Sequence, residues 1–218
     1  MDCRGEGREG RHGFFRFASR SRPTRCLAAF VLTFLAGSHA FGSDCPDGKT
    51  AKKGFVLGRP GVNSVVRPSD EQVTMLQNTY KSETPQTQFL VGGLIEVFRD
   101  GAKGQFVALP ESDFRKLFPL REGEEQEVSW LWLDAKKGRV ERNSMSLKVT
   151  GVETLSLGSC AYDVQAVRQI LMSGEGEVLD ARTALYSPEL QAVLAKRYDE
   201  GTTRELTVAY RTIRPLVE

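Results

Sequence analysis

The sequence is almost free of histidine, and its two histidines, His12 and His39, both lie in the first 40 residues. Residues 41–218 contain none, which excludes Ser-His-Asp catalysis, Cys-His catalysis and histidine-based zinc sites from that part of the chain. A calcium-binding Asp-x-Asp-x-Asp-Gly loop is also missing. From these absences we expect no metal site, no cofactor and no catalytic residue.

Cysteine is scarce as well, with four in the chain and no Cys-x-x-Cys pair that would indicate a redox motif. Two of the four, Cys3 and Cys26, lie in the first 40 residues. We expect the other two, Cys45 and Cys160, to form a structural disulfide bond, as two cysteines of an exported chain commonly do. A bridge between two molecules is the alternative.

No apolar run is long enough to cross a bilayer as a helix, which takes roughly 20 residues. The uncharged apolar run at 26–37 has twelve residues, follows seven arginines in residues 1–25, and precedes Ser38-His39-Ala40. A basic segment, a short apolar segment and a small-x-small site are typical of a secretory signal peptide. We predict a signal peptide over 1–40, cleavage after Ala40 and a periplasmic protein. An uncleaved anchor or a buried helix is the alternative.

Positive charge is also in short supply once the leader is removed. Residues 1–40 carry seven of the 30 basic and three of the 28 acidic residues, so 23 basic and 25 acidic residues remain and the net charge is −2. No cluster of lysine and arginine stands out in this remainder. We therefore expect no nucleic-acid partner.

What remains is about 178 residues, a length that suits a single domain. We expect an N-terminal arm over 41–53 and a single β-rich domain over 54–218. Short strand patterns separated by turn residues recur at 55–57, 62–67, 88–99, 105–109, 125–134, 139–151, 160–172, 177–186 and 204–213. They predict a mainly β fold: a strongly curved antiparallel sheet or open half-barrel of about ten short strands with one short helix.

Some stretches are ambiguous. The pair Gly92-Gly93 inside the most apolar run predicts a bulge or a bend. Residues 71–80 fit a strand or a short helix, and 154–159 fit a turn. Ser187–Tyr198 fits a helix capped by Ser187 or a turn followed by a strand; the neighbouring hairpin patterns favour the strand.

Aromatic residues gather in two places. A short helix over 112–118, capped by Ser112, is predicted to cover an open end of the sheet or to act as a lid. The strand at 125–134 places its two tryptophans on one parity, as core residues or as a stacking platform for carbohydrate. The aromatic side chains of these two segments are the candidate ligand-facing residues: Phe114, Phe118, Trp130 and Trp132.

Four segments occur in a recognisable order: Leu-Phe-Pro-Leu-Arg-Glu-Gly at 117–123, Val-Thr-Gly-Val-Glu-Thr at 149–154, Gly-Ser-Cys-Ala-Tyr at 158–162 and Thr-Ala-Leu-Tyr-Ser-Pro-Glu-Leu at 183–190. This pattern resembles an uncharacterised family of bacterial periplasmic β-sheet domains, distantly like the lipoprotein-carrier half-barrels. The resemblance implies a half-barrel and a lipid or other apolar ligand, but no active-site residue. Leu185 replaces an aromatic residue of the pattern, and Gln191 replaces a glycine.

These observations together predict an exported, non-enzymatic protein with a binding or envelope-assembly role, whose partner is a lipid or other apolar ligand or an envelope protein. The first alternative is a carboxylate-based hydrolase acting on envelope glycan, which needs paired carboxylates across a groove. Its strand-borne candidates are Glu96, Asp163, Glu177 and Asp180. The second alternative is a structural scaffold or protein-partner module that uses an exposed sheet edge.

Overall fold

A computed structural model of the protein describes residues 45–70 and 72–217, which form one antiparallel sheet. The proposed signal peptide and its cleavage site lie outside the described residues. Within the described residues, no helix is long and apolar enough to cross a membrane. The sheet has thirteen strands: β1 (Phe55–Arg59), β2 (Val62–Asp70), β3 (Val73–Tyr80), β4 (Gln86–Val91), β5 (Ile95–Gly101), β6 (Gly104–Pro110), β7 (Glu125–Asp134), β8 (Arg139–Leu157), β9 (Cys160–Ser173), β10 (Val178–Ser187), β11 (Ala192–Tyr198), β12 (Leu206–Ala209) and β13 (Thr212–Pro215).

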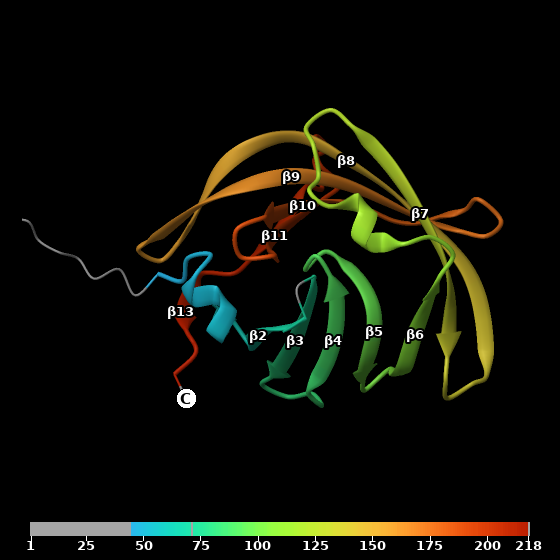
Figure 1. Ribbon diagram of the computed structural model, residues 1–218, viewed down its shortest axis with the longest axis horizontal. Coiled ribbons are helices and arrows are strands. Elements are labelled where there is room, and N and C mark those ends of the chain that lie inside the picture. Colours follow the sequence, from blue (N-terminus) through green and yellow to red (C-terminus); the bar gives the residue numbers. More distant parts are fainter. Residues whose placement is uncertain (1–44, 71, 218) are drawn as a thin grey trace, which may run out of the picture. The chain divides into compact units, whose positions relative to one another are not determined.

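The connection between the last two strands joins the two edges of the sheet. From β1 to β12 every strand pairs with the next strand of the sequence, but β13 pairs with β1 at the opposite edge from β12. Only two residues separate β12 from β13. Of these, Tyr210 donates its backbone N–H to Leu194 of β11 (3.1 Å), and Arg211 donates to Gly58 of β1 (2.7 Å). The two ends of the sheet therefore meet at residues 210–211. Figure 1 shows strands β2–β6 on one side of the molecule and the long strands β8 and β9 on the other.

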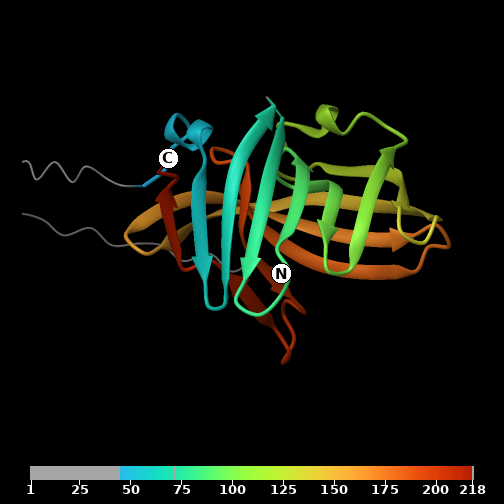
Figure 2. The same ribbon diagram turned by 90° about the horizontal axis from the view of Figure 1, so that it is seen from below.

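The predicted class, a mainly β fold built on a curved and open antiparallel sheet, is confirmed. Strands β1–β6 cross the long strands β8 and β9 at a steep angle (Figure 2). The structure has thirteen strands where about ten were predicted, because the patterns at 88–99 and 204–213 each hold two strands and 71–80 holds β3.

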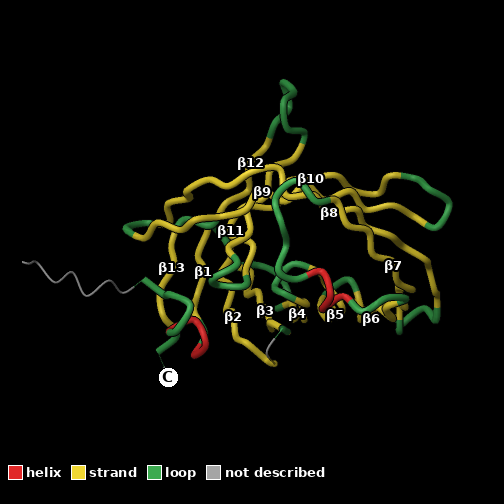
Figure 3. Tube along the Cα trace, turned by 45° about the horizontal axis from the view of Figure 1, so that its top comes forward, coloured by secondary structure: helices red, strands yellow, loops and turns green. Residues whose placement is uncertain are grey.

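The predicted short helix is a single 3-10 turn, η2 (Phe114–Leu117). A second such turn, η1 (Thr50–Lys53), lies in the N-terminal arm, and strands make up most of the rest (Figure 3). The cap of η2 is Asp113 and not Ser112, because the Asp113 carboxylate accepts the N–H of Arg115 at 3.1 Å. This bond satisfies one of the free N–H groups at the start of the turn.

Two other ambiguous stretches are now defined. The turn predicted over 154–159 is confined to residues 158–159, because β8 stays paired with β9 as far as Leu157 opposite Cys160. Both of these residues are buried, so pairing to the end of the hairpin is supported by packing. In Ser187–Tyr198 the strand interpretation is confirmed, with a turn before β11.

The predicted bend at Gly92-Gly93 is confirmed as the turn between β4 and β5. Gly93 has φ +72°, and a Cβ atom added there would lie 1.6 Å from the carbonyl oxygen of Gln191. Gln191 itself has φ 48°, in the left-handed region that glycine adopts most readily. The corner before β11 therefore keeps a glycine-like backbone although glutamine stands there.

The buried apolar residues form two clusters. The first packs η2 against β4–β10 and includes Phe114, Trp130 and Met145. The second packs η1, β1, β2 and β13 against β8–β11 and includes Phe55 and Leu194. Strands β8, β9 and β10 contribute residues to both clusters.

The predicted disulfide bond is present between Cys45 and Cys160, which are 115 residues apart. It joins the N-terminal arm to the first residue of β9. Beside it, the hydroxyl of Tyr162 donates to the carbonyl oxygen of Pro46 at 2.9 Å. Burial raises the pKa of Tyr162 to about 12, with smaller contributions from the charges of Glu189 and Asp47, so this donor keeps its proton at neutral pH.

Removal of the disulfide should destabilise the domain. Closing a loop of this length contributes roughly 4–5 kcal/mol in the chain-entropy model. We expect the double variant C45A/C160A to lose about 3–4 kcal/mol in free energy of unfolding, measured by denaturant titration. Wild-type protein treated with reductant serves as the matched control and should lose a similar amount. A loss below about 1 kcal/mol in the variant would contradict this assignment.

The close approach of the two turns gives a second prediction. The substitution Gly93→Ala forces the backbone at Gln191 to move as well as straining a left-handed residue, so we expect a loss of about 3 kcal/mol or more. Gly61 also has a positive φ, but its Cβ would meet nothing within 4 Å. Gly61→Ala should therefore cost about 1 kcal/mol. Equal losses in the two variants would show that the contact with Gln191 is unimportant.

Candidate binding cavity

A cavity of about 520 Å³ lies inside the curved sheet and opens to solvent. Its wall takes residues from both apolar clusters, such as Leu57 and Met145, and many polar side chains from β3, β4, β5, β9, β10 and β11. Volumes of roughly 300–1,000 Å³ are typical of sites for small molecules. The cavity is therefore the candidate functional site of the described domain.

Two ion pairs lie on this wall. The pairing of β4 with β5 shifts so that Leu90 faces Glu96 while Phe89 faces Phe98, and the extra residue between them places both Glu96 and Arg99 on the cavity side. The guanidinium of Arg99 donates two hydrogen bonds to the Glu96 carboxylate, each at 2.5 Å. Such a two-bond contact fixes both side chains.

In the second ion pair, β10 presents Asp180 and Arg182 to the cavity, two residues apart and therefore on one face of the strand. The Arg182 guanidinium donates to the Asp180 carboxylate and, through Nε at 2.9 Å, to Oε1 of Gln169 on β9. Gln169 is directly opposite Arg182 in the pairing of the two strands.

Lys196 on β11 is a further cavity residue, half-buried beside these ion pairs. Among the described residues, no hydrogen bond or ion pair joins its ammonium group to another side chain. Burial, with smaller contributions from the charges of Arg182 and Arg99, lowers the pKa of Lys196 to about 8. The carboxylates of Glu96 and Asp180 act in the opposite direction but offset only part of the shift.

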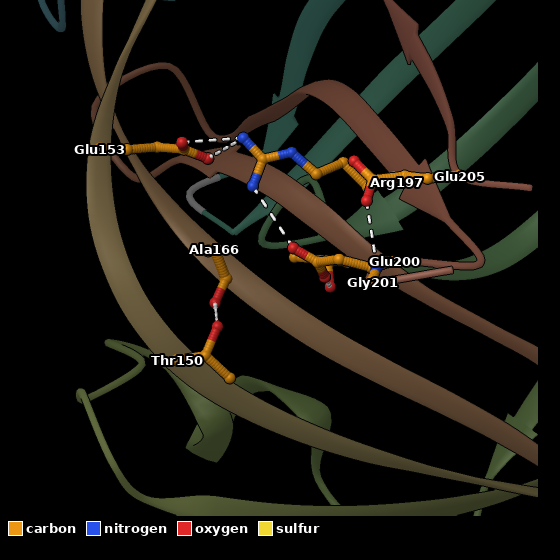
Figure 4. A network of polar contacts seen from close by, with 8 residues as sticks. Thr150, Glu153, Ala166, Arg197, Glu200, Gly201 and Glu205 are labelled. Carbon is orange, nitrogen blue, oxygen red and sulfur yellow. Dashed lines mark hydrogen bonds and ion pairs between the residues drawn. The ribbon is translucent and has the colours of Figure 1, made fainter. Parts of the chain in front are cut away.

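The next residue of β11, Arg197, is paired where Lys196 is not. Arg197 points to the other face of the sheet, where its Nη2 lies 2.6 and 2.8 Å from the two carboxylate oxygens of Glu153 (Figure 4). Its Nη1 lies 3.6 Å from Glu200. The hydrogen bonds to Glu153 raise the pKa of Arg197. Of two adjacent cations, the outer one is paired and the one in the cavity is not.

Two buried N–H donors on the cavity wall also lack partners. Trp130 is 4% exposed and Gln169 is 2% exposed, and neither Trp130 Nε1 nor Gln169 Nε2 makes a hydrogen bond within the described part of the chain. A buried donor without an acceptor costs about 1–3 kcal/mol. Most buried polar groups in proteins are paired, so two unpaired donors on one wall need a physical reason.

Polar side chains of β2–β4, in contrast, form hydrogen bonds with one another. The Ser64 hydroxyl donates to Asn78 Oδ1 at 2.6 Å, so the hydroxyl of Tyr210, 2.8 Å away, is the donor to Ser64. Asn78 Nδ2 and the hydroxyl of Tyr80 both donate to Gln86 Oε1 at 3.3 Å. This network ties the crossing between β12 and β13 to the sheet below it.

The four candidate ligand-facing aromatics divide into two pairs. Trp130 and Trp132 line the cavity, and Trp132 stacks on Phe106 with 5.8 Å between ring centroids. Phe114 is buried in the core with its ring edge-on to Trp130, and Phe118 covers Gly92 and contacts the ring of Tyr186. Neither phenylalanine belongs to the cavity wall.

Of the four carboxylates proposed for the hydrolase alternative, two line the cavity and two do not. Glu96 and Asp180 line the cavity, each bound to an arginine, whereas Asp163 and Glu177 are exposed. In residues 45–70 and 72–217, no three cysteine, histidine or acidic side chains are grouped closely enough to hold a metal ion.

Sequence reasoning named Glu96 and Asp180 but missed the basic and amide residues of the wall. A signal was available for Lys196, which shares its strand parity with the apolar residues Ala192 and Leu194. For Arg99 there was none, because its direction depends on the bulge in β5.

An open β half-barrel with a polar cavity is the class of structure that these features define. No family model matches the sequence, and no curated protein does. The fold is similar to the crystal structure of the hypothetical lipoprotein YmcC from Escherichia coli (K12), with a TM-score of 0.47 and 12% sequence identity. The match covers 78% of this chain and 90% of that chain. The resemblance to a periplasmic family stays a prediction.

The unpaired lysine gives a prediction on stability. Lys196→Met keeps the length of the side chain and removes a desolvated charge, so we expect a gain of about 2 kcal/mol in free energy of unfolding at pH 7. In the wild type the cost of this charge disappears as Lys196 loses its proton above pH 8, while the unfolded lysine stays charged to about pH 10. The gain should therefore shrink between pH 7 and about pH 9.5.

Denaturant titration of wild type and variant at both pH values measures this difference. A variant that is less stable than wild type at pH 7, or a difference that does not change with pH, would contradict the environment assigned to Lys196.

Proposed function

We propose that this is an exported, non-enzymatic binding protein whose half-barrel cavity holds a small ligand rich in hydrogen-bond acceptors. The observation that carries the proposal is the pair of buried, unpartnered donors, Trp130 Nε1 and Gln169 Nε2, on one cavity wall. An acceptor atom of a bound ligand would recover the cost of burying each donor.

The mixture of polar and apolar residues on the wall narrows the class of ligand that we expect. A purely apolar ligand would leave both donors and the Lys196 ammonium group unpaired, at a cost of several kcal/mol. The apolar wall residues Leu57, Leu90 and Leu94 still offer contacts for the carbon skeleton of a ligand. A ligand with acceptor groups on an apolar framework fits the wall better than a simple lipid chain does.

The envelope location is part of the same proposal. It is supported by the leader pattern in residues 1–40 and by the bond between Cys45 and Cys160, because disulfides persist in oxidising compartments such as the periplasm.

A binding role is favoured over the two alternatives. In a glycan hydrolase one carboxyl group has to act as an acid and the other as a base or nucleophile. The two cavity carboxylates, Glu96 and Asp180, are each engaged by an arginine, which supports a charge-balancing role. A purely structural scaffold has no need of a cavity of this volume.

Native mass spectrometry tests the proposal on protein expressed with its leader and purified from the periplasm without refolding. We expect a small-molecule adduct on the wild type. Trp130→Phe keeps an aromatic ring against Phe114 but removes the indole N–H, so we expect the ligand affinity to fall about tenfold, equivalent to about 1.4 kcal/mol, and the adduct occupancy to fall with it. Trp132→Phe is the matched control, because its indole N–H is not among the buried unpartnered donors.

Occupancy in Trp132→Phe should fall less than about threefold. A wild-type protein that is bare in every preparation, or equal occupancy in wild type and Trp130→Phe, would overturn the proposed role of the cavity.

A further inference from the structure

We propose that the ligand carries an acid group, either a carboxylate or a phosphate-type oxyanion, and that this group binds beside Lys196. The inference rests on the proposed binding function and narrows the class of ligand. The cavity wall carries four basic and two acidic side chains, an excess of two positive charges. They are Arg59, Arg99, Arg182, Lys196, Glu96 and Asp180. This excess is opposite in sign to the net charge of −2 over residues 41–218.

The internal ion pairs leave two of the four basic side chains, Arg59 and Lys196, and Lys196 is the one whose charge is influenced by both ion pairs. Arg99 is bound by Glu96, and Arg182 by Asp180. Lys196 is half-buried and has no ion-pair or hydrogen-bond partner among the described residues, although both carboxylates are near enough to influence its charge. Charged side chains that are removed from water are normally paired. A bound acid group would supply the missing partner.

The strand pairing also places a neutral donor close to this cation. Arg182 is opposite Gln169 on one side and Tyr198 on the other, while Lys196 precedes Tyr198 by two residues on β11. Gln169 uses its oxygen to accept from Arg182, which leaves its unpartnered Nε2 on the same wall. The free N–H donor therefore lies directly across from Arg182, and Lys196, which is paired with Ala184, lies diagonally across from the same arginine on its other side. Together they could bind separate acceptor atoms of one oxyanion.

The protonation state of Lys196 supports this assignment. The charged groups that face it are Arg182 and Asp180 from β10 and Arg99 and Glu96 from β5. Burial together with the two arginines lowers its pKa to about 8, so at neutral pH Lys196 is still a cation but one held at a cost. An anion bound beside it would raise the pKa again, and by linkage its binding must weaken as Lys196 loses its proton.

The first test uses sulfate and citrate as probes of the two acid classes, with chloride at equal ionic strength as the reference, on dialysed protein at pH 7. We expect sulfate or citrate to raise the melting temperature of the wild type above the chloride value. Lys196→Met should weaken the apparent affinity for that anion at least tenfold, and Lys196→Arg should retain most of it. General salt effects act on all variants alike.

Arg197→Met is the matched control, because it removes the adjacent cation on the outer face of the same strand. It should lower the melting temperature in chloride but leave the anion-dependent increase intact. A response to sulfate supports a phosphate-type group and a response to citrate supports a carboxylate. No response to either anion, or an equal response in Lys196→Met, would overturn the inference.

The second test is the pH dependence of the response. Sulfate keeps its charge between pH 7 and 9.5, whereas Lys196 loses its proton. Sulfate affinity of the wild type should therefore fall about tenfold over this range if sulfate is the anion that responds, and citrate affinity should fall in the same way if citrate is. Lys196→Arg should show no such fall. A wild-type affinity that is independent of pH would contradict a site at Lys196.

The adduct seen by native mass spectrometry separates this inference from the proposed function. An adduct that releases phosphate or carbon dioxide on fragmentation, and is depleted in Lys196→Met, supports both; acyl fragments would identify a lipid headgroup, and their absence a free acid. A neutral adduct, or one retained equally by Lys196→Met, overturns the acid group but leaves the binding function standing. Absence of any adduct together with absence of an anion response overturns both.

Discussion

Two backbone hydrogen bonds on consecutive residues determine the form of this domain. Tyr210 bonds to Leu194 on β11 and Arg211 bonds to Gly58 on β1, so two residues of chain join opposite ends of a thirteen-stranded sheet. Because both ends are fixed at this crossing, the strands between them have to curve around an interior. The Ser64–Asn78–Tyr210 network stabilises the same crossing from inside, and the disulfide attaches the N-terminal arm beside it.

The interior formed in this way is not filled with apolar side chains alone. An antiparallel sheet with one covered face usually places apolar residues inward and polar residues outward. Here several strands place cations, carboxylates and amides inward, and the costs remain visible as a lysine with a lowered pKa and two unpartnered donors. Polar and charged side chains that break the usual inward-apolar pattern are most common at binding and catalytic sites. The cavity wall therefore carries a cost in stability, which the proposed ligand would offset.

The sequence was sufficient for the class of fold but not for the site. Alternation along 160–172 and the recurrence of short strand patterns between turn residues predicted the antiparallel sheet, and two cysteines in a chain predicted to be exported indicated their bond. The direction of Arg99 depends on one extra residue in β5, and the pairing of Arg182 with Gln169 depends on the register of β9 and β10. Both are properties of strand pairs, so a single strand pattern could not reveal them. The Gly92-Gly93 bend was predictable, but its contact with Gln191, about a hundred residues away, was not.

The most direct test of the central claim is a high-resolution crystal structure of protein purified from the periplasm without refolding. We expect density for a small molecule inside the half-barrel, with acceptor atoms within hydrogen-bond distance of Trp130 Nε1 and Gln169 Nε2 and an acid group near Lys196 Nζ. A cavity collapsed by its own side chains, or one in which ordered waters alone satisfy the two donors, would contradict it.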